Sequence, residues 1–178
     1  MPCWSNSLWN CWSEKLLPSC FCKSLRSFKI SSLPTQHPEL FRAVVSQVGI
    51  YDMLRVELDP NGAFNTTEFG TVKSPDQFKA LFAYSPYHHV VDGTRYPAIF
   101  MATGETDGRV NPAHSRKMIA RLQAATAPGR PVFLSINAHA GHGIGSALSI
   151  RVNQSADLYS FLFAQLGMSL PTKPTILP

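Results

Sequence analysis

An aspartate and a histidine stand in two loops of this sequence, in an arrangement that suits a hydrolase. Asp107 lies in the loop over 104–112 and His142 in the loop over 138–145. Each loop follows a strand-like run and precedes a segment with helical periodicity. At the carboxyl edge of a parallel sheet, such an aspartate can orient the imidazole and stabilise its protonated form, as in a Ser-His-Asp triad. Taken alone, the two residues are also compatible with ordinary polar loops.

The elements that must position these side chains alternate between strands and helices. Strands are predicted over 42–49, 96–103 and 130–136, and helices over 74–84, from 111–112 onward and over 146–166, with Gly167 as a C-cap. Short connections between them predict parallel strands with right-handed crossovers. On the helices we expect core-facing residues at Phe78, Leu81, Phe82, Met118, Ile119 and Leu122.

Composition restricts the class of protein. The chain has 178 residues, 44% of them hydrophobic and 15% charged, which suits one globular domain. Its formal net charge is +5, but the first 33 residues hold four basic residues against one acidic residue, which leaves +2 for the rest. No basic stripe follows, so we expect no nucleic-acid partner. Polar residues interrupt the apolar stretch over 9–21, so we expect no signal peptide, no membrane span and a cytoplasmic location.

The cysteines and histidines do not indicate a metal site. All four cysteines lie within the first 22 residues, and Cys20 and Cys22 lack a second pair at zinc-site spacing. In a reducing compartment we expect free thiols. The neighbours His88 and His89 cannot chelate from one strand face, and no pattern of acidic residues accompanies them. We therefore expect neither a metal nor a cofactor.

A series of short motifs follows in order along the chain. They are Pro38-Glu39-Leu40-Phe41, the stretch from Gln47 to Leu54, Tyr84-Ser85-Pro86-Tyr87-His88, the stretch from Asp107 to Pro112 with His114-Ser115, and Gly141-His142-Gly143. In order and spacing they resemble the C-terminal part of the catalytic domain of the prolyl oligopeptidase family of serine peptidases. The resemblance implies an α/β fold, namely a partial α/β-hydrolase fold with a parallel sheet, flanking helices and the nucleophile-bearing half missing. It divides the chain into an atypical, poorly ordered segment over 1–33, the hydrolase portion over 34–168 and a loose tail over 169–178.

The resemblance also assigns roles. It implies that Asp107 is the triad acid, that His142 is the triad base and that Arg109 hydrogen-bonds a substrate carbonyl. The alternative for Arg109 is a surface ion pair with Glu105. The family places an aromatic residue that stacks on a substrate proline near Phe64 and Asn65, and the corresponding position is closer to Asn65.

The nucleophile departs from the family's pattern. The family has a Gly-x-Ser-x-Gly elbow, roughly 14 residues before the Pro-Glu-Leu-Phe segment, and counting back leads to Ser24. Cys22 and Arg26 replace the two glycines, and we expect no strand leading into this serine. Two hypotheses follow. One is a serine hydrolase that cleaves peptide or ester substrates, and the other is a non-catalytic truncated fragment or pseudoenzyme acting as an interaction module.

The strand over 42–49 carries a further expectation. In the resembling fold its inner neighbour bears the nucleophile, and residues 1–33 contain no apolar run suited to replace that neighbour. An unpaired apolar strand is an association site. We therefore expect the Arg42–Gly49 edge to pair with a second copy of the chain or with an upstream fragment.

Overall fold

The computed structural model describes residues 19–21, 28–142 and 147–169. Within them, four strands form one sheet in the order β1-β2-β3-β4, and every neighbouring pair is parallel. The strands are β1 (Ser19–Phe21), β2 (Ala43–Gln47), β3 (Ala98–Gly104) and β4 (Val132–Asn137). The α-helices are α2 (Phe28–Gln36), α3 (Gly62–Phe69), α4 (Pro75–Tyr84), α5 (Ala113–Ala125) and α6 (Leu148–Leu166). Short 3-10 helices are η1 (Pro38–Leu40), η2 (Val56–Leu58) and η3 (Pro86–His89).

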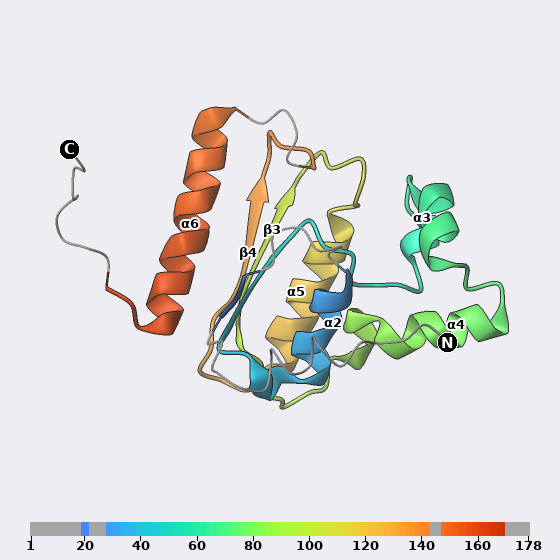
Figure 1. Cartoon of the computed structure of the whole chain (residues 1–178), viewed down its shortest axis with the longest axis horizontal. Coiled ribbons are helices and arrows are strands. Elements are labelled where there is room, and N and C mark those ends of the chain that lie inside the picture. The colour runs from blue at the N-terminus through green and yellow to red at the C-terminus, as the bar shows by residue number, and fades with distance from the viewer. Residues whose placement is uncertain (1–18, 22–27, 143–146, 170–178) are drawn as a thin grey trace, which may run out of the picture.

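Helices cover both faces of the sheet. Figure 1 shows α6 on one face and α5 with α2 on the other, while α3 and α4 lie beyond that second layer. A parallel sheet covered in this way is rich in apolar residues along its whole length, and all seven residues of β3 are buried. The parallel sheet with flanking helices that the sequence predicts is confirmed.

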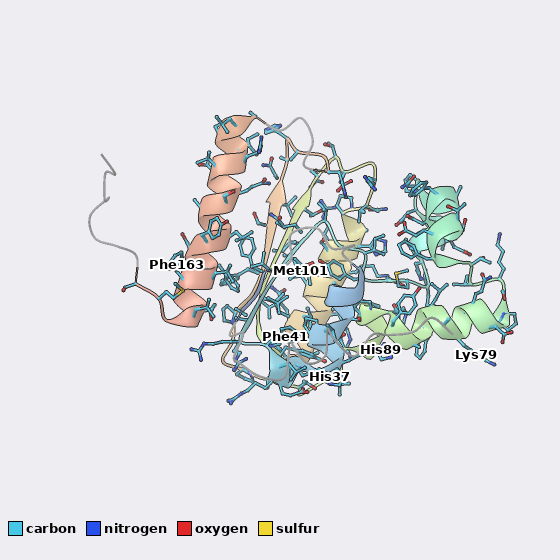
Figure 2. All side chains as sticks on the ribbon, viewed as in Figure 1. His37, Phe41, Lys79, His89, Met101 and Phe163 are labelled. Atoms are coloured by element: carbon cyan, nitrogen blue, oxygen red, sulfur yellow. The ribbon has the colours of Figure 1, made fainter. Side chains whose placement is uncertain are left out.

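The two sides of the strands supply two separate cores. Val44, Ile99 and Met101 pack toward α5, and Figure 2 labels Met101 in this interior. Val45 and Phe100, one position away, pack against α6. This alternation follows from the two-residue period of a strand. The predicted inner face of α5 is confirmed by its buried residues Met118, Ile119 and Leu122.

Helix α4 begins where the sequence indicates but buries less than expected. Ser74 is its N-cap and Pro75 its first residue. Leu81 is its buried residue, whereas Phe78 and Phe82 are 40% and 43% exposed, so the expectation of a core position for these two is wrong. The reason is that α4 packs through Leu81 on Met53 and Val56, away from the sheet. The two phenylalanines, one helical turn apart, stack on each other instead, with centroids 6.3 Å apart.

The N-terminal side of the sheet differs from the expectation. Strand β1 pairs with β2, and Ser19, Cys20 and Phe21 lie opposite Ala43, Val44 and Val45. Strand β2 is therefore an inner strand at Ala43–Val45, so the expectation of an unpaired Arg42–Gly49 edge is wrong at these three residues, and the expectation of no strand before Ser24 is wrong. The pairing involves only three residues of each strand. A strand this short is too brief to be detected from the periodicity of apolar residues.

The last helix ends as the sequence predicts. Gly167 adopts a left-handed conformation with φ 67°, and its N–H bonds to carbonyls of the last turn. Glycine adopts this conformation without the steric penalty of a β-carbon.

Candidate active site

Asp107 and His142 meet at the carboxyl edge of the sheet. Asp107 follows the end of β3, and His142 follows the end of the neighbouring strand β4. Nδ1 of His142 lies 2.8 Å from Oδ2 of Asp107. The predicted proximity of the two side chains is confirmed.

The surroundings of Asp107 define which nitrogen of the histidine carries a proton. The Asp107 side chain is fully buried, and its Oδ1 accepts backbone N–H bonds from Arg109 and Val110, each 2.9 Å long. An ionised carboxylate can only accept hydrogen bonds, so Nδ1 of His142 must be the donor to Oδ2. This tautomer leaves Nε2 with an accessible lone pair, and the His142 side chain is 26% exposed. The pair can therefore act as a general base whose ring is held in one orientation.

A glycine allows the two loops to come together. At Gly104, the last residue of β3, a β-carbon would lie 2.1 Å from the carbonyl oxygen of Ala140. The carbonyl of Ala140 also accepts bonds from the backbone N–H and the hydroxyl of Thr106, at 3.3 and 3.2 Å. Any larger residue at Gly104 would push the His142 loop away from the Asp107 loop.

A second polar cluster, formed by Asp59, Asn61, Asn111 and His114, connects the Asp107 loop to the segment before α3 and to the start of α5. Nε2 of His114, at the start of α5, lies 2.8 Å from Oδ2 of Asp59, and the Nδ2 of Asn111 donates to Oδ1 of the same carboxylate at 3.2 Å. Asn61 donates to the carbonyl of Arg109 at 3.3 Å. The residues in each of these contacts are 48 to 55 positions apart in sequence. No local sequence pattern indicates such contacts, so they were not predicted.

A buried carboxylate lies on the other side of His114. The backbone N–H of Asp52 donates to Nδ1 of His114 at 3.2 Å, and the Asp52 carboxylate pairs with Lys117. Lys117 also lies 4.6 Å from the centroid of the Tyr87 ring. Burial lowers the pKa of His88 below its ordinary value, although the Asp52 carboxylate nearby acts in the opposite direction.

The end of β2 reaches the same edge and is strained. Val48 has φ 48°, a left-handed conformation that costs a β-branched residue about 1–3 kcal/mol. Its N–H donates to the carbonyl of Ala102 on β3 at 2.9 Å. Just beyond, the buried Tyr51 donates its hydroxyl to Oγ of Ser46 at 2.7 Å, and burial raises the pKa of Tyr51 to about 12.

The three residues expected from the sequence to contact substrate, Arg109, Phe64 and Asn65, differ in their exposure to solvent. Arg109 is exposed and belongs to the same loop as Asp107. Its alternative partner Glu105 instead forms an ion pair with Arg116, whose Nη2 donates to both carboxylate oxygens. On α3, Phe64 is 55% exposed and Asn65 is 5% exposed.

Ser24 lies outside the described residues. Among the residues that the structure describes, no three or more His, Cys, Asp or Glu side chains gather in a way that could hold a metal ion. No helix in this part of the chain combines the length and the apolar character needed to cross a bilayer.

Comparisons with known proteins agree on one family. The sequence profile of the prolyl oligopeptidase family matches residues 28–169. The chain is 37% identical to a prolyl endopeptidase of Dictyostelium discoideum over 144 residues, covering 79% of this chain and 19% of the relative. It is 39% identical to a prolyl endopeptidase of Elizabethkingia miricola over 140 residues, covering 78% and 20%.

Solved structures give the same result. A structure from a study of two prolyl endopeptidases superimposes with a TM-score of 0.76 at 42% identity, covering 79% of this chain and 21% of that one. The chain therefore spans about a fifth of the length of the relatives that it matches.

Proposed function

Because this chain belongs to the prolyl oligopeptidase family, we propose that it supplies the acid and the base of a serine peptidase that hydrolyses peptide bonds. The observation that carries the proposal is the 2.8 Å contact between Asp107 and His142, together with the two backbone N–H groups that hold Asp107 in place. These contacts support a histidine whose Nε2 can accept a proton.

In the proposed reaction, Nε2 of His142 accepts the proton of a serine hydroxyl as its oxygen attacks the substrate carbonyl. Asp107 stabilises the imidazolium that forms. The protonated ring then gives its proton to the leaving amine, and an acyl-enzyme remains. The same nitrogen then takes a proton from a water molecule, whose oxygen attacks the acyl carbonyl. The imidazolium returns that proton to the departing serine oxygen, so the acid product leaves and both the serine hydroxyl and the neutral histidine are restored.

Ser24 is the residue that we propose as the nucleophile. The segment that contains it connects β1, which ends at Phe21, to α2, which begins at Phe28. A serine between a strand and a helix fits the context of a nucleophile elbow. Strand β1 is also parallel to the strands that precede Asp107 and His142, so all three strands end at the same edge of the sheet.

The substrate side of the proposal concerns Arg109 and α3. Arg109 follows Asp107 by two positions, and its exposed guanidinium is suited to donate to a substrate carbonyl. Helix α3 is attached to this loop through Asn61, and it presents Phe64 at its surface. We propose contact with the substrate through Phe64 rather than Asn65, since Asn65 is buried. The matched relatives are named prolyl endopeptidases, so peptides containing proline are the first substrates to test.

A second candidate function is that of a non-catalytic interaction module. It is favoured by the sequence around Ser24, where Cys22 and Arg26 stand in place of the two glycines of the elbow. Larger residues clash at that tight turn. In this case the outer side of β1, which pairs with no strand within the described residues, is the proposed contact for a second copy or an upstream fragment.

Labelling with a fluorophosphonate probe separates the two candidates, because the probe reacts only with an activated serine. If the chain is a hydrolase, mass spectrometry will identify the probe on Ser24. Ser24→Ala and His142→Gln will each abolish labelling, and heat-denatured protein will not react. Ser155→Ala, which removes an exposed serine on α6, is the matched control and will label as the unchanged chain does.

A folded chain that shows no labelling would reject the hydrolase and leave the interaction module. Labelling that survives Ser24→Ala but not His142→Gln would replace Ser24 by another serine and retain the roles of Asp107 and His142.

A further inference from the structure

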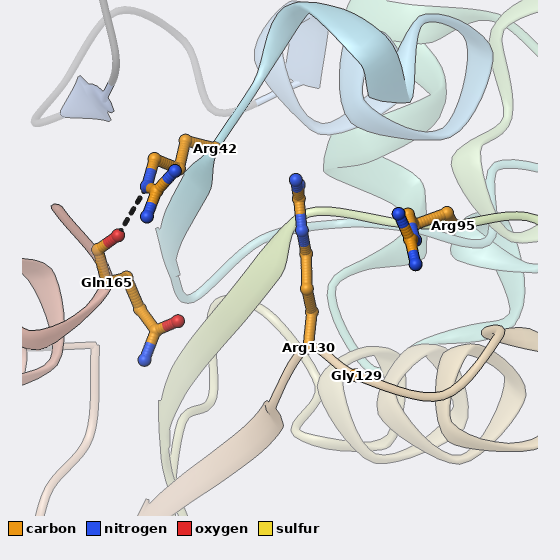
Figure 3. A pocket seen from close by; sticks show the side chains of 5 residues that line it. All are labelled: Arg42, Arg95, Gly129, Arg130 and Gln165. Atoms are coloured by element: carbon orange, nitrogen blue, oxygen red, sulfur yellow. Dashed lines mark hydrogen bonds between the residues drawn. The ribbon is translucent and has the colours of Figure 1, made fainter.

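Three arginines gather at the edge of the sheet opposite to Asp107 and His142. Arg42 directly precedes β2, Arg95 lies just before β3, and Arg130 lies just before β4. Because β2, β3 and β4 are parallel neighbours, their amino ends lie side by side. The three side chains line one pocket of about 350 Å³ together with Gly129 and Gln165, and Figure 3 shows Arg130 between Arg42 and Arg95.

The fold holds two of these arginines without neutralising their charge. Nε of Arg42 donates to the backbone carbonyl of Gln165 at 2.6 Å, and Arg130 donates to the backbone carbonyl of Phe41 at 3.3 Å. Both acceptors are uncharged. A guanidinium has five N–H donors, so each of these residues keeps further donors for a ligand.

Three other basic side chains among the described residues do have acidic partners, whereas Arg55, Lys73, Lys79, Arg109 and Arg151 have none within ion-pair distance. Arg116 pairs with Glu105, Arg121 with Asp92, and Lys117 with Asp52. Among the described residues, no carboxylate lies within ion-pair distance of Arg42, Arg95 or Arg130. Three positive charges that share a pocket repel one another, and a bound anion would relieve this repulsion.

The lining of the pocket restricts the chemistry of that anion. It consists of three guanidinium side chains, one amide side chain and a glycine, so it offers neither an aromatic platform nor a large apolar surface. An acyl chain would find no apolar surface to pack on. Phosphate oxygens match the planar fork of arginine and can accept two parallel bonds from one guanidinium.

We propose that this pocket is a binding site for a compact anion with several negative charges, of the pyrophosphate class. The site is separate from the proposed hydrolytic site and does not depend on it. Residues Arg42, Arg95 and Arg130 supply the charge, and the turn at Gly129, with φ 120°, sets the direction in which the chain enters Arg130.

Calorimetric titration of the full chain with sodium pyrophosphate at constant ionic strength tests the proposal. We expect saturable binding that is at least tenfold tighter than binding of sulfate. Arg95→Gln and Arg130→Gln will each weaken it by on the order of 10-fold or more, the loss expected for a charge-assisted bond. Arg151→Gln removes the same charge from an exposed site on α6, about 21 Å along the helix from Gln165, and will leave binding unchanged.

Arg95→Gln is the decisive variant because Arg95 is exposed and its replacement is compatible with folding, which circular dichroism verifies. The proposal is overturned if pyrophosphate shows no saturable binding. It is also overturned if pyrophosphate and sulfate bind equally, or if Arg151→Gln weakens binding as much as the pocket variants do.

Discussion

Asp59 and His114, 55 positions apart in sequence, share a contact of 2.8 Å between Oδ2 and Nε2. The same carboxylate accepts a bond from Asn111, so one side chain connects the region before α3 to the end of the Asp107 loop and to the start of α5. The side chain of His114 is 5% exposed and therefore depends on this partner.

Asp59→Ala is expected to destabilise the fold by about 3 kcal/mol, because it removes two bonds to a charged acceptor and leaves a buried histidine nitrogen without its partner. Urea unfolding followed by circular dichroism measures the change. Asp157→Ala, the same substitution at an exposed position on α6, is the control and should stay within about 0.5 kcal/mol. Equal effects of the two variants would show that the Asp59 contacts contribute nothing.

Asp107→Asn is expected to change the tautomer of His142. The backbone N–H groups of Arg109 and Val110 occupy Oδ1, so the amide of the variant must turn its NH₂ group toward His142. Nδ1 then has to accept, and the proton moves to Nε2. Long-range ¹⁵N–¹H correlation spectra of the imidazole, assigned with His142→Gln, distinguish the two tautomers without any need for activity. An Nε2–H tautomer already present in the unchanged chain would contradict the geometry described above.

Gly104→Ala is expected to separate the two loops. The new methyl group would lie 2.1 Å from a backbone oxygen that cannot move without displacing residues 140–141, so we expect a loss of about 3 kcal/mol or more and the disappearance of the Nδ1–H signal of His142. Gly108→Ala is the matched control, since a β-carbon there meets nothing within 4 Å. It should change the free energy of unfolding by less than about 1 kcal/mol. Equal tolerance of both alanines would refute the close approach at Gly104.

Tyr51 is expected to make the protein lose stability in alkali. Burial raises its pKa from 10.0 to about 12 in the folded chain, so between these pH values the folded form keeps a proton that the unfolded form releases. Stability is complete below about pH 10 and falls as the pH rises toward about 12. Unfolding measured across this range should show a smaller fall for Tyr51→Phe. Tyr159→Phe, which leaves Tyr51 in place, should retain the full fall, and an identical slope in both variants would disprove the assignment.

Leu122→Ala is expected to cost about 2–5 kcal/mol, because Leu122 is fully buried between α5 and the sheet and its truncation leaves a cavity. Leu58→Ala makes the same change at a side chain that is 73% exposed, and it should stay within about 0.5 kcal/mol. The midpoints of urea unfolding of the two variants provide the comparison. A loss below 1 kcal/mol for Leu122→Ala would mean that this core can collapse around the gap.

Elements with local patterns could be predicted from the amino-acid sequence. The long apolar run before Asp107 marked β3, Ser74 and Pro75 marked the start of α4, and Gly167 marked the end of α6. The approach of Asp107 to His142 was also predictable, because two successive parallel strands must end at the same edge.

Contacts between residues that are distant in sequence could not be predicted in this way, because they form only when the chain is folded. Three examples depend on which elements become neighbours. They are the contact between Asp59 and His114, the close approach of the Ala140 carbonyl to Gly104, and the pocket lined by Arg42, Arg95 and Arg130. The exposure of Phe78 and Phe82 was decided in the same way, because helical periodicity shows which residues share a face but not which face meets the core. Strand β1 exists through its pairing with β2, since three residues have too little intrinsic preference to form a strand alone.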